Sequence, residues 1–231
     1  MATYSGTVLV IGATGRTGRA IVARLKHYGI AFRLYVRSGE KAAELFGSTV
    51  ETAIQVGSIE DEAALNAAMQ GCTALICAIG SNPADPSSPP PSAIDRDAVR
   101  RLARLALEAG MRRFILISSL GATHPEHPLN KYGQVLTMKL EGEDEVRRRF
   151  STPEQAHTVI RPGGLLDAPP FRHKLIAATG DTISGSICRG DVAEIAVLSL
   201  SETVTSNATF ELIQGDETPQ KSLQSTFASL K

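Results

Sequence analysis

Hydrophobic residues in this chain form short runs that alternate with amphipathic stretches. The run Thr7–Ile11 is almost entirely β-branched or aliphatic, which is typical of a strand buried on both faces of a parallel sheet. From Gly15 to Tyr28, hydrophobic residues recur at a helical spacing, and Gly29 follows as a stop signal. The N-terminal segment therefore predicts a strand followed by an amphipathic helix.

The same alternation continues along the chain. Further strands are predicted over Ala31–Val36, Val50–Val56, Ala74–Ala78, Arg113–Ile117, His157–Arg161 and Thr209–Ile213. Helices are predicted over Lys41–Phe46, Glu60–Met69, Asp95–Ala109, Tyr132–Phe150 and Asp191–Leu200, with a last amphipathic segment over Pro219–Leu230. Strands that alternate with helices indicate an α/β fold with a doubly wound parallel sheet, whose ligands bind at the carboxyl ends of the strands. We expect one domain over residues 1–231 with a small C-terminal elaboration.

One segment breaks this rhythm. Ser81–Ser92 contains five prolines and four serines, so it buries little surface and cannot join a sheet. We expect a mobile loop there. It either closes over a bound cofactor as a lid or lies on the surface without such a role.

Composition narrows the class of protein. The 231 residues carry 24 basic and 24 acidic side chains, so the chain lacks the positive footprint of a nucleic-acid binder. Its hydrophobic runs fall well short of the roughly 20 residues that cross a bilayer. Cys72, Cys77 and Cys188 have neither a disulfide-framework nor a zinc-site spacing. We therefore expect a soluble cytoplasmic protein with no nucleic-acid or membrane partner, as a monomer or small homo-oligomer.

Three glycines occupy the turn between the first strand and the first helix. The turn is Gly12–Gly18, with the sequence Gly-Ala-Thr-Gly-Arg-Thr-Gly. Its glycines permit a tight bend and let backbone N–H groups approach a pyrophosphate at the helix N-terminus. The spacing differs by one residue from the usual Gly-x-Gly-x-x-Gly fingerprint, and the alternative is close packing of helix and strand alone. The strand–turn–helix context favours a dinucleotide site.

The second predicted strand ends in a cation. NAD-binding proteins usually carry an acid here, which accepts from the ribose hydroxyls and would repel a 2′-phosphate. Arg37 can instead bind a phosphate through two hydrogen bonds, and Ser38 and Lys41 are near enough in sequence to add donors. A charge-assisted hydrogen bond contributes about 1.5–3 kcal/mol. We therefore expect NADP(H) as the cofactor; the alternative is a solvated arginine at a strand end.

Five segments are specific in combination: Gly12–Gly18, Val36–Ser38, Ile115–Ala122, Ile160–Leu165 and Arg189–Ala193. With them the chain resembles the atypical short-chain dehydrogenase/reductase family, in its NmrA-like and biliverdin-reductase-B-like branch. The resemblance runs from about residue 8 to residue 192 and implies a Rossmann-type NADP-binding domain, with residues 163–231 on the substrate side. It does not fix the substrate, because members include reductases, epimerase-like enzymes and redox-sensing regulators.

The resemblance also implies roles for individual residues. The pyrophosphate would be held by Gly12, Thr14, Gly15, Arg16, Thr17 and Gly18, and the adenosine phosphate by Arg37, Ser38 and Lys41. The adenosine side would be lined by Ala78, Ile79 and Gly80, with Ser58 at a position where relatives often carry an aspartate that meets the adenine amine. The nicotinamide side would be formed by Ser118, Ser119, Pro162, Gly163, Gly164 and Leu165.

The catalytic pattern of the wider family, Tyr-x-x-x-Lys, is absent from the chain. Tyr132 is followed four residues later by Leu136, and Lys139 lies seven residues along, roughly 10 Å up a helix axis. The remaining candidates are Ser119 as a hydrogen-bond donor to substrate, Tyr132 as a proton donor, and Lys139 as a contact of the nicotinamide ribose. The alternatives are a turn serine, a surface tyrosine and a lysine on a charged helix face.

Histidines offer one further candidate. His173 follows the sixth predicted strand, where the substrate pocket of the family forms, and it is a candidate substrate contact. His124 and His127 lie in a proline-containing loop, and a third ligand would have to come from elsewhere in the chain, so we expect no metal site.

Together these features predict an NADPH-dependent oxidoreductase that transfers a hydride to a small conjugated or carbonyl acceptor. A conjugated acceptor can take its proton from water after the hydride has been transferred. Quinones, flavins and tetrapyrroles are therefore candidate acceptors as well as ketones. The alternatives are an NADP-binding redox-sensing regulator without turnover and a sugar-nucleotide epimerase-like enzyme.

Overall fold

The computed structural model describes residues 4–47, 53–82, 85, 87–216 and 226–227. The strands are β1 (Thr7–Ile11), β2 (Phe32–Val36), β3 (Ile54–Val56), β4 (Cys72–Cys77), β5 (Arg113–Ile117), β6 (Ala156–Pro162), β7 (Gly164–Leu166), β8 (Leu175–Ala178), β9 (Ser186–Cys188) and β10 (Ala208–Gln214). The α-helices are α1 (Arg16–His27), α2 (Gly39–Phe46), α3 (Glu62–Met69), α4 (Val99–Glu108), α5 (Val135–Arg149) and α6 (Arg189–Leu198). A π-helix, η2, covers Ser92–Ala98, and 3₁₀-helices η3 and η4 cover Pro128–Lys131 and Thr203–Thr205.

The central sheet has eight strands in the order β3-β2-β1-β4-β5-β6-β10-β8. Its neighbouring strands are parallel except for the edge pair β10–β8. The chain winds outward from β1 in one direction and from β4 in the other, which opens a crevice beyond their carboxyl ends. Ile11 pairs with Tyr35 on β2 and with Cys77 on β4, so three strands end at one level. The expected doubly wound sheet is confirmed.

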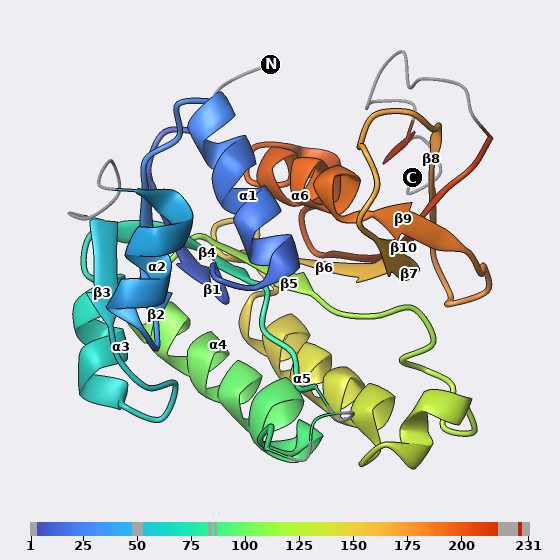
Figure 1. The fold of residues 1–231 in the computed structure, drawn as a ribbon, viewed down its shortest axis with the longest axis horizontal. Helices are drawn as coiled ribbons and strands as arrows, with labels where there is room; N and C mark the ends of the chain where they lie inside the picture. Colours follow the sequence, from blue (N-terminus) through green and yellow to red (C-terminus); the bar gives the residue numbers. More distant parts are fainter. Residues whose placement is uncertain (1–3, 48–52, 83–84, 86, 217–225, 228–231) are drawn as a thin grey trace.

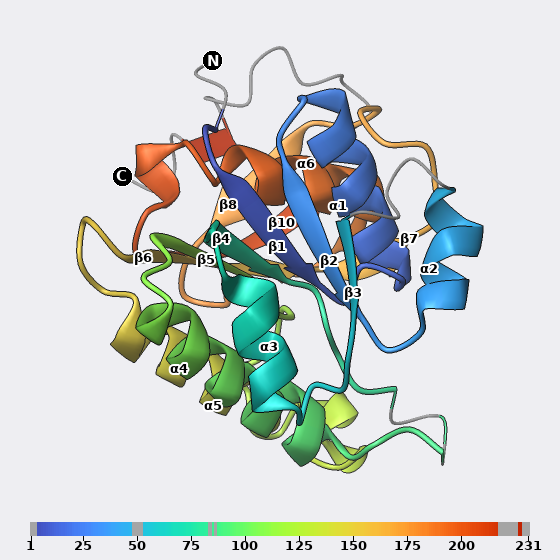
Figure 2. The same ribbon diagram turned by 90° about the vertical axis from the view of Figure 1, so that its left-hand side faces the viewer.

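Helices cover both faces of this sheet, as Figure 1 and Figure 2 show. Helices α1, α2 and α6 pack on one face, and α3, α4 and α5 pack on the other. Along β1, Val8 and Val10 belong to the core under α1 and α6, whereas Leu9 and Ile11 belong to the core under α3 and α4. Burial on both faces explains why the strand reads as one continuous hydrophobic run.

The C-terminal elaboration is built largely into the central sheet. Strand β10 pairs in parallel with β6, with Phe210 opposite Ile160, and β8 adds an antiparallel edge. Strands β7 and β9 form a separate two-stranded sheet. The sequence pattern does not predict β7, β8 or β9, because strands of three or four residues are too short to show a periodicity.

Most helices begin within two residues of the expected start, but two begin three residues away from it. The helix expected from Asp95 starts as η2 at Ser92, and α4 continues it. The helix expected from Tyr132 starts only at Val135, because Gly133 and Gln134 adopt positive φ angles of 69° and 59°. Of the predicted elements, residues 50–52 and most of the segment 219–230 lie outside the described residues.

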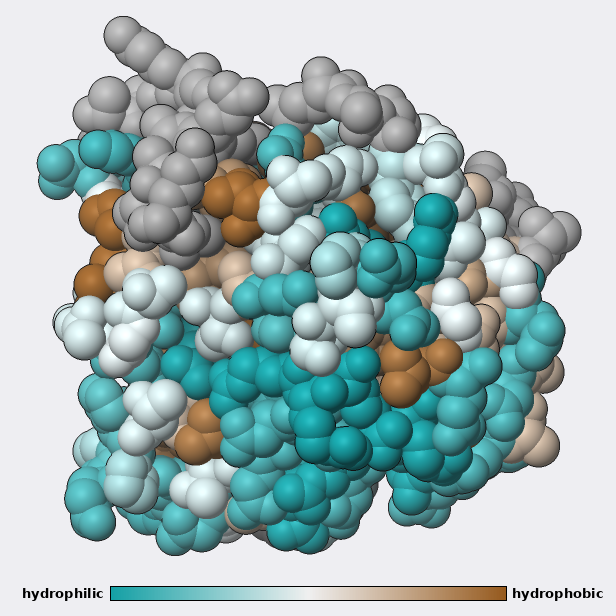
Figure 3. All heavy atoms as spheres, turned by 180° about the vertical axis from the view of Figure 1, so that it is seen from behind, coloured by the Kyte–Doolittle hydropathy of each residue, from teal (hydrophilic) through white to brown (hydrophobic). Residues whose placement is uncertain are grey.

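The molecular surface is mostly hydrophilic on the face seen in Figure 3, where hydrophobic residues occur in separate groups. Such scattered hydrophobic groups are normal for a water-exposed surface. In the described part of the chain, no helix is long and hydrophobic enough to cross a membrane.

Candidate functional site

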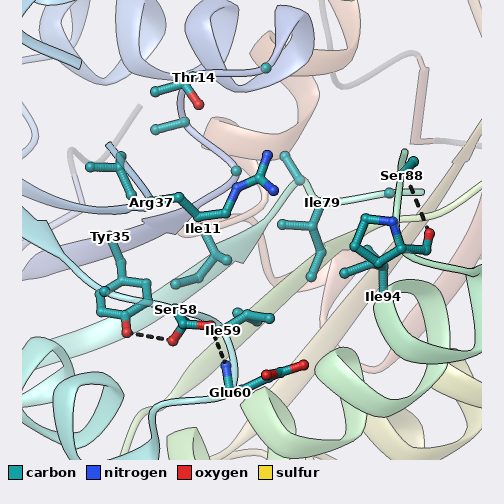
Figure 4. Close-up of a pocket in the computed structure, with 18 of the residues that line it drawn as sticks. Ile11, Thr14, Tyr35, Arg37, Ser58, Ile59, Glu60, Ile79, Ser88 and Ile94 are labelled. Carbon is teal, nitrogen blue, oxygen red and sulfur yellow. Dashed lines mark hydrogen bonds between the residues drawn. The ribbon is translucent and has the colours of Figure 1, made fainter. Parts of the chain in front are cut away.

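A pocket of about 410 Å³ opens at the carboxyl ends of β1, β2 and β4 (Figure 4). The crevice predicted by the topology and this pocket therefore coincide. One part of its lining consists of residues expected from the sequence: Gly12, Thr14, Gly15, Arg37, Lys41, Ser58, Ala78, Ile79 and Gly80. A second part comes from the loop before η2 and from η2 itself: Ser88, Pro89, Ala93 and Ile94. Every lining residue lies between Ile11 and Ile94.

The glycine turn brings backbone donors to the wall of the pocket. Gly12 has a φ of +86°, and a Cβ there would lie 2.6 Å from the carbonyl oxygen of Ala78 on the neighbouring strand end. A Cβ at Gly18 would lie 2.1 Å from the carbonyl oxygen of Gly12, so helix and turn touch through their backbones. Gly15 is the N-cap of α1 and has no side chain to satisfy the first N–H groups, and the first turn holds no acid. This helix end is suited to an anion.

Two cations stand at the end of β2. Arg37 and Lys41 both line the pocket. Among the residues that the structure describes, no carboxylate forms an ion pair with either side chain. Ser38 Oγ accepts a hydrogen bond of 3.2 Å from the backbone N–H of Lys41 and so caps α2, which orients the segment between the two cations. The positive charge here is available to an anionic ligand.

The loop after β3 forms the lower wall in Figure 4. The Tyr35 hydroxyl donates a 2.7 Å hydrogen bond to the carbonyl oxygen of Ser58, and burial raises the pKa of Tyr35. Ser58 Oγ accepts from the backbone N–H of Glu60 at 3.2 Å. The Ser58 side chain therefore stabilises its own turn while it faces the pocket.

The end of β4 forms another part of the pocket wall. The backbone N–H of Ala78 donates to the carbonyl oxygen of Ile11, which holds Ala78, Ile79 and Gly80 against the glycine turn. Lys139, from α5, lies just past this wall: a Cβ added to Gly80 would be 3.4 Å from Lys139 Nζ. The structure therefore brings Lys139 beside the predicted cofactor residues.

Ser118 is directed into the protein. Its hydroxyl donates to Glu143 Oε1, and the same carboxylate accepts hydrogen bonds from Arg161 on β6. Arg161 also contacts Glu211 on β10, with 3.4 Å between Nη1 and Oε1. The expected contact between Ser118 and nicotinamide stays a prediction, but its hydroxyl hydrogen is already bonded to Glu143. Ser119 is half-buried, and its hydroxyl donates to the carbonyl oxygen of Leu120 at 3.1 Å.

Tyr132 stands apart from these groups. It lies between η3 and α5, is 42% exposed, and has the Lys131 ammonium 4.9 Å from its ring centroid. It therefore shares no helix face with Lys139, and its role as proton donor remains a prediction.

The expected nicotinamide wall is ordered by backbone hydrogen bonds. The carbonyl oxygen of Pro162 accepts from Leu120, while Gly163 donates to Leu212 and Gly164 donates to Gly185. Leu165 follows on β7 and packs against the core. These bonds place the start of β7 beside the end of β5, and a contact with nicotinamide, which the family resemblance implies, stays a prediction.

Arg16 spans from the glycine turn to the loop after β7. Its Nη1 lies 2.6 Å from Asp167 Oδ2, and Arg189 donates to the other oxygen of Asp167 at 2.7 Å. Because the side chains of Arg16 and Asp167 are 63% and 55% exposed, water screens their attraction and the pair contributes little to stability. Arg16 thus remains free to exchange this partner for a phosphate. Thr17 lies in the first turn of α1, beside Arg16.

His173 lies near the start of α6, and it does not line the pocket. Its Nδ1 atom and Asp191 Oδ2 are both buried without a hydrogen-bond partner in the described structure. Asp191 Oδ1 accepts from the backbone N–H of Phe171, and burial raises the pKa of Asp191. A substrate contact for His173 remains a prediction.

Sequence reasoning missed several groups that shape the site. Asp95 bonds to Lys139 across 44 positions of sequence, and Arg161 bonds to Glu143 across 18. Pairs of opposite charge at such separations give no local signal. Glu60 could have been found from the sequence, since it stands two residues beyond Ser58, at the start of the helix predicted over Glu60–Met69.

Known proteins share this architecture. Residues 12–203 match the NAD(P)H-binding family. A chloroplastic protein of Arabidopsis thaliana, described as uncharacterised, is 31% identical over 97% of this chain and 82% of its own. The sanguinarine reductase of Eschscholzia californica is 27% identical and covers 89% of this chain and 88% of its own. A solved structure from Bacillus halodurans, described as an NAD-dependent epimerase/dehydratase, is 29% identical with a TM-score of 0.79, covering 93% of this chain and 96% of that one.

These matches bear on two expectations. One relative is chloroplastic and another is bacterial, so the cytoplasmic location stays a prediction. The family match spans the glycine turn, Arg37, Lys139 and the start of β7, which is the whole of the site described above. The chain therefore belongs to the NAD(P)H-binding family and has the Rossmann fold of the atypical short-chain dehydrogenases/reductases.

Proposed function

We propose that the protein is an NADPH-dependent oxidoreductase that passes a hydride to a small conjugated or carbonyl acceptor. One observation carries the proposal: the pocket combines a glycine turn, at a helix start without a side-chain cap, with two cations, Arg37 and Lys41, that have no ion-pair partner among the described residues. The glycine turn fits a pyrophosphate, and the cations fit the 2′-phosphate that distinguishes NADP(H) from NAD(H).

The residues present suit this cofactor in their donor chemistry. The turn Gly12–Gly18 would hold the pyrophosphate, Arg37, Ser38 and Lys41 the 2′-phosphate, and Ser58 and Ile79 would flank the adenosine. When bound, the cofactor supplies a hydride from its nicotinamide ring. Lys139, Ser119 and the start of β7 would orient that ring and exclude water around it.

The acceptor class follows from the proton-donating groups at hand. Tyr132 lies on the surface before α5 and has no lysine one helical turn away, so the site lacks an activated phenol of the usual kind. An acceptor that stabilises the added electron pair by conjugation, such as a quinone, flavin or tetrapyrrole, does not require one. The similarity to a protein named sanguinarine reductase supports reduction as the reaction type.

A second candidate is an epimerase-like reaction on a sugar nucleotide. The Bacillus halodurans protein, described as an NAD-dependent epimerase/dehydratase, favours it, and that description also keeps NAD open as the cofactor. A regulator that binds NADP(H) without turnover is the third possibility.

Two measurements distinguish these functions. Calorimetric titration with NADP⁺, NADPH and NAD⁺ tests the cofactor, and we expect tighter binding of both phosphorylated forms. NADPH consumption is then followed with a panel of quinones, flavins, tetrapyrroles and aldehydes. The background is the rate at which NADPH is consumed with each acceptor when the protein is left out. Turnover above background supports the oxidoreductase. Binding without consumption points to the regulator, whereas conversion of a sugar nucleotide without net consumption of the cofactor points to the epimerase.

A further inference from the structure

A buried carboxylate lies directly behind the end of β4. Asp95, in η2, is 2% exposed, and its Oδ1 atom accepts a 2.6 Å hydrogen bond from Lys139 Nζ. Its Oδ2 atom accepts from both the backbone N–H and the hydroxyl of Ser81, the residue after Gly80. One carboxylate thus joins three segments: the end of β4, η2 and α5.

The fold holds this carboxylate firmly. It belongs to a π-helix, a rare element that recurs at functional sites. A Cβ added to Gly142 of α5 would lie 2.4 Å from the carbonyl oxygen of Asp95, so the two helices touch through their backbones at this point. A larger residue at position 142 would push α5, and Lys139 with it, away from η2.

The pairing has an energetic cost. Burying a carboxylate is unfavourable, and even a good ion pair often only balances that loss. Lysine also loses much rotamer freedom when it is fixed. The result is an ammonium held in one place, with its side chain 17% exposed, immediately beyond Gly80.

We propose that Asp95 is a positioning residue, which holds the Lys139 ammonium where it binds the hydroxyls of the nicotinamide ribose. The inference rests on the proposed function. Lys139 does not line the pocket that fits the adenosine half, but it stands just past the Gly80 wall of that pocket, where the rest of a dinucleotide would continue. Fixing the lysine in advance reduces the ordering cost when the ligand binds.

A double-mutant cycle tests this role. The variants are Asp95→Asn, Lys139→Met and the two combined, and the ligands are NADPH and 2′,5′-ADP, which lacks the nicotinamide ribose. We expect each single variant to weaken NADPH binding by about threefold or more, with no further loss when Asp95→Asn is added to Lys139→Met. Affinity for 2′,5′-ADP should stay within about twofold.

Two further variants keep the test decisive. Asp97→Asn is the matched control, because Asp97 lies in the same π-helix with its side chain 48% exposed and pairs with Arg96; it should change neither affinity. If Asp95→Asn does not fold, Ser81→Ala serves instead. It removes the hydroxyl that donates to Asp95 Oδ2 and leaves the ion pair between Asp95 and Lys139 in place. Its smaller loss of NADPH affinity should vanish in the Lys139→Met background.

Several results would overturn the inference. Additive losses in the cycle, an equal loss for 2′,5′-ADP, or tighter NADPH binding by Asp95→Asn would each show that Asp95 does not act through Lys139. These results differ from failure of the proposed function, in which the unaltered protein would bind neither nucleotide.

Discussion

Arg161 and Glu143 form a buried ion pair between β6 and α5. Arg161 Nη2 lies 2.6 Å from Glu143 Oε2, and Nε donates to both carboxylate oxygens at 3.1 and 3.2 Å. The Ser118 hydroxyl at the end of β5 donates to the same carboxylate. The pair therefore joins two strand ends and a helix beneath the predicted nicotinamide wall, while Glu211 approaches the guanidinium from β10.

Removal of the guanidinium should destabilise the fold strongly. Arg161→Met leaves the buried carboxyl groups of Glu143 and Glu211 without their shared guanidinium, and we expect a loss of about 3–5 kcal/mol in the free energy of unfolding. Urea denaturation measures it. Arg148→Met is the control, because the Arg148 side chain is 64% exposed and pairs with Glu145 on the same helix, so its loss should be much smaller. Equal losses for both variants would contradict the importance of the buried pair.

Glu211 should make stability depend on pH. Burial raises the pKa of Glu211, and its Oε2 atom lacks a hydrogen-bond partner in the described structure. The folded protein therefore holds this proton at a pH where the unfolded chain has released it. The resulting stabilisation is present below the ordinary glutamate pKa of about 4.3 and is lost as the pH rises through the folded-state pKa.

The variant Glu211→Gln isolates this effect. Denaturation of both proteins from about pH 4 to about pH 8 should show the unaltered protein losing stability relative to the variant as the pH rises. A relative gain with rising pH would mean that Arg161 keeps Glu211 ionised in the folded protein.

Arg37 should set the preference for the phosphorylated cofactor. Arg37→Glu replaces a guanidinium that lines the pocket by a carboxylate that repels the 2′-phosphate. We expect NADP⁺ affinity to fall by about tenfold or more while NAD⁺ affinity changes little. Calorimetry measures both, and Arg148→Glu controls for the change in net charge. Equal losses for the two nucleotides would remove Arg37 from the phosphate site.

Gly18 should tolerate no side chain. In Gly18→Ala the new methyl group needs space 2.1 Å from the Gly12 carbonyl oxygen, so α1 must move away from the turn. We expect a loss of about 1–3 kcal/mol in stability and about tenfold or more in NADP⁺ affinity. Gly29→Ala is the matched control: Gly29 has a φ of +63° but open space around it, so stability should fall by about 1–2 kcal/mol with NADP⁺ binding intact. Retained binding in Gly18→Ala would show that the helix start does not hold the nucleotide.

The sequence predicts those parts of the molecule whose signal is local. Strand β5 was expected over Arg113–Ile117 and has these bounds, because a strand buried on both faces must be continuously hydrophobic. The glycine turn and Arg37 are likewise readable, since each follows directly from a predicted strand end. Their convergence in one pocket then follows from the topology of a parallel sheet.

Other parts depend on contacts that no local pattern encodes. The π-helix at Ser92–Ala98 differs from an α-helix only in its hydrogen-bond register, which side-chain spacing over two turns does not resolve. The orientation of Ser118 depends on Glu143, which is 25 residues away and is itself held by Arg161. For the same reason the sequence named Lys139 but not Asp95, the group that fixes it.

The confinement of the pocket lining to Ile11–Ile94 has an evolutionary consequence. The groups proposed to select the phosphorylated nucleotide therefore lie in one N-terminal stretch of the chain, so substitutions after Ile94 can accumulate while that stretch is inherited unchanged.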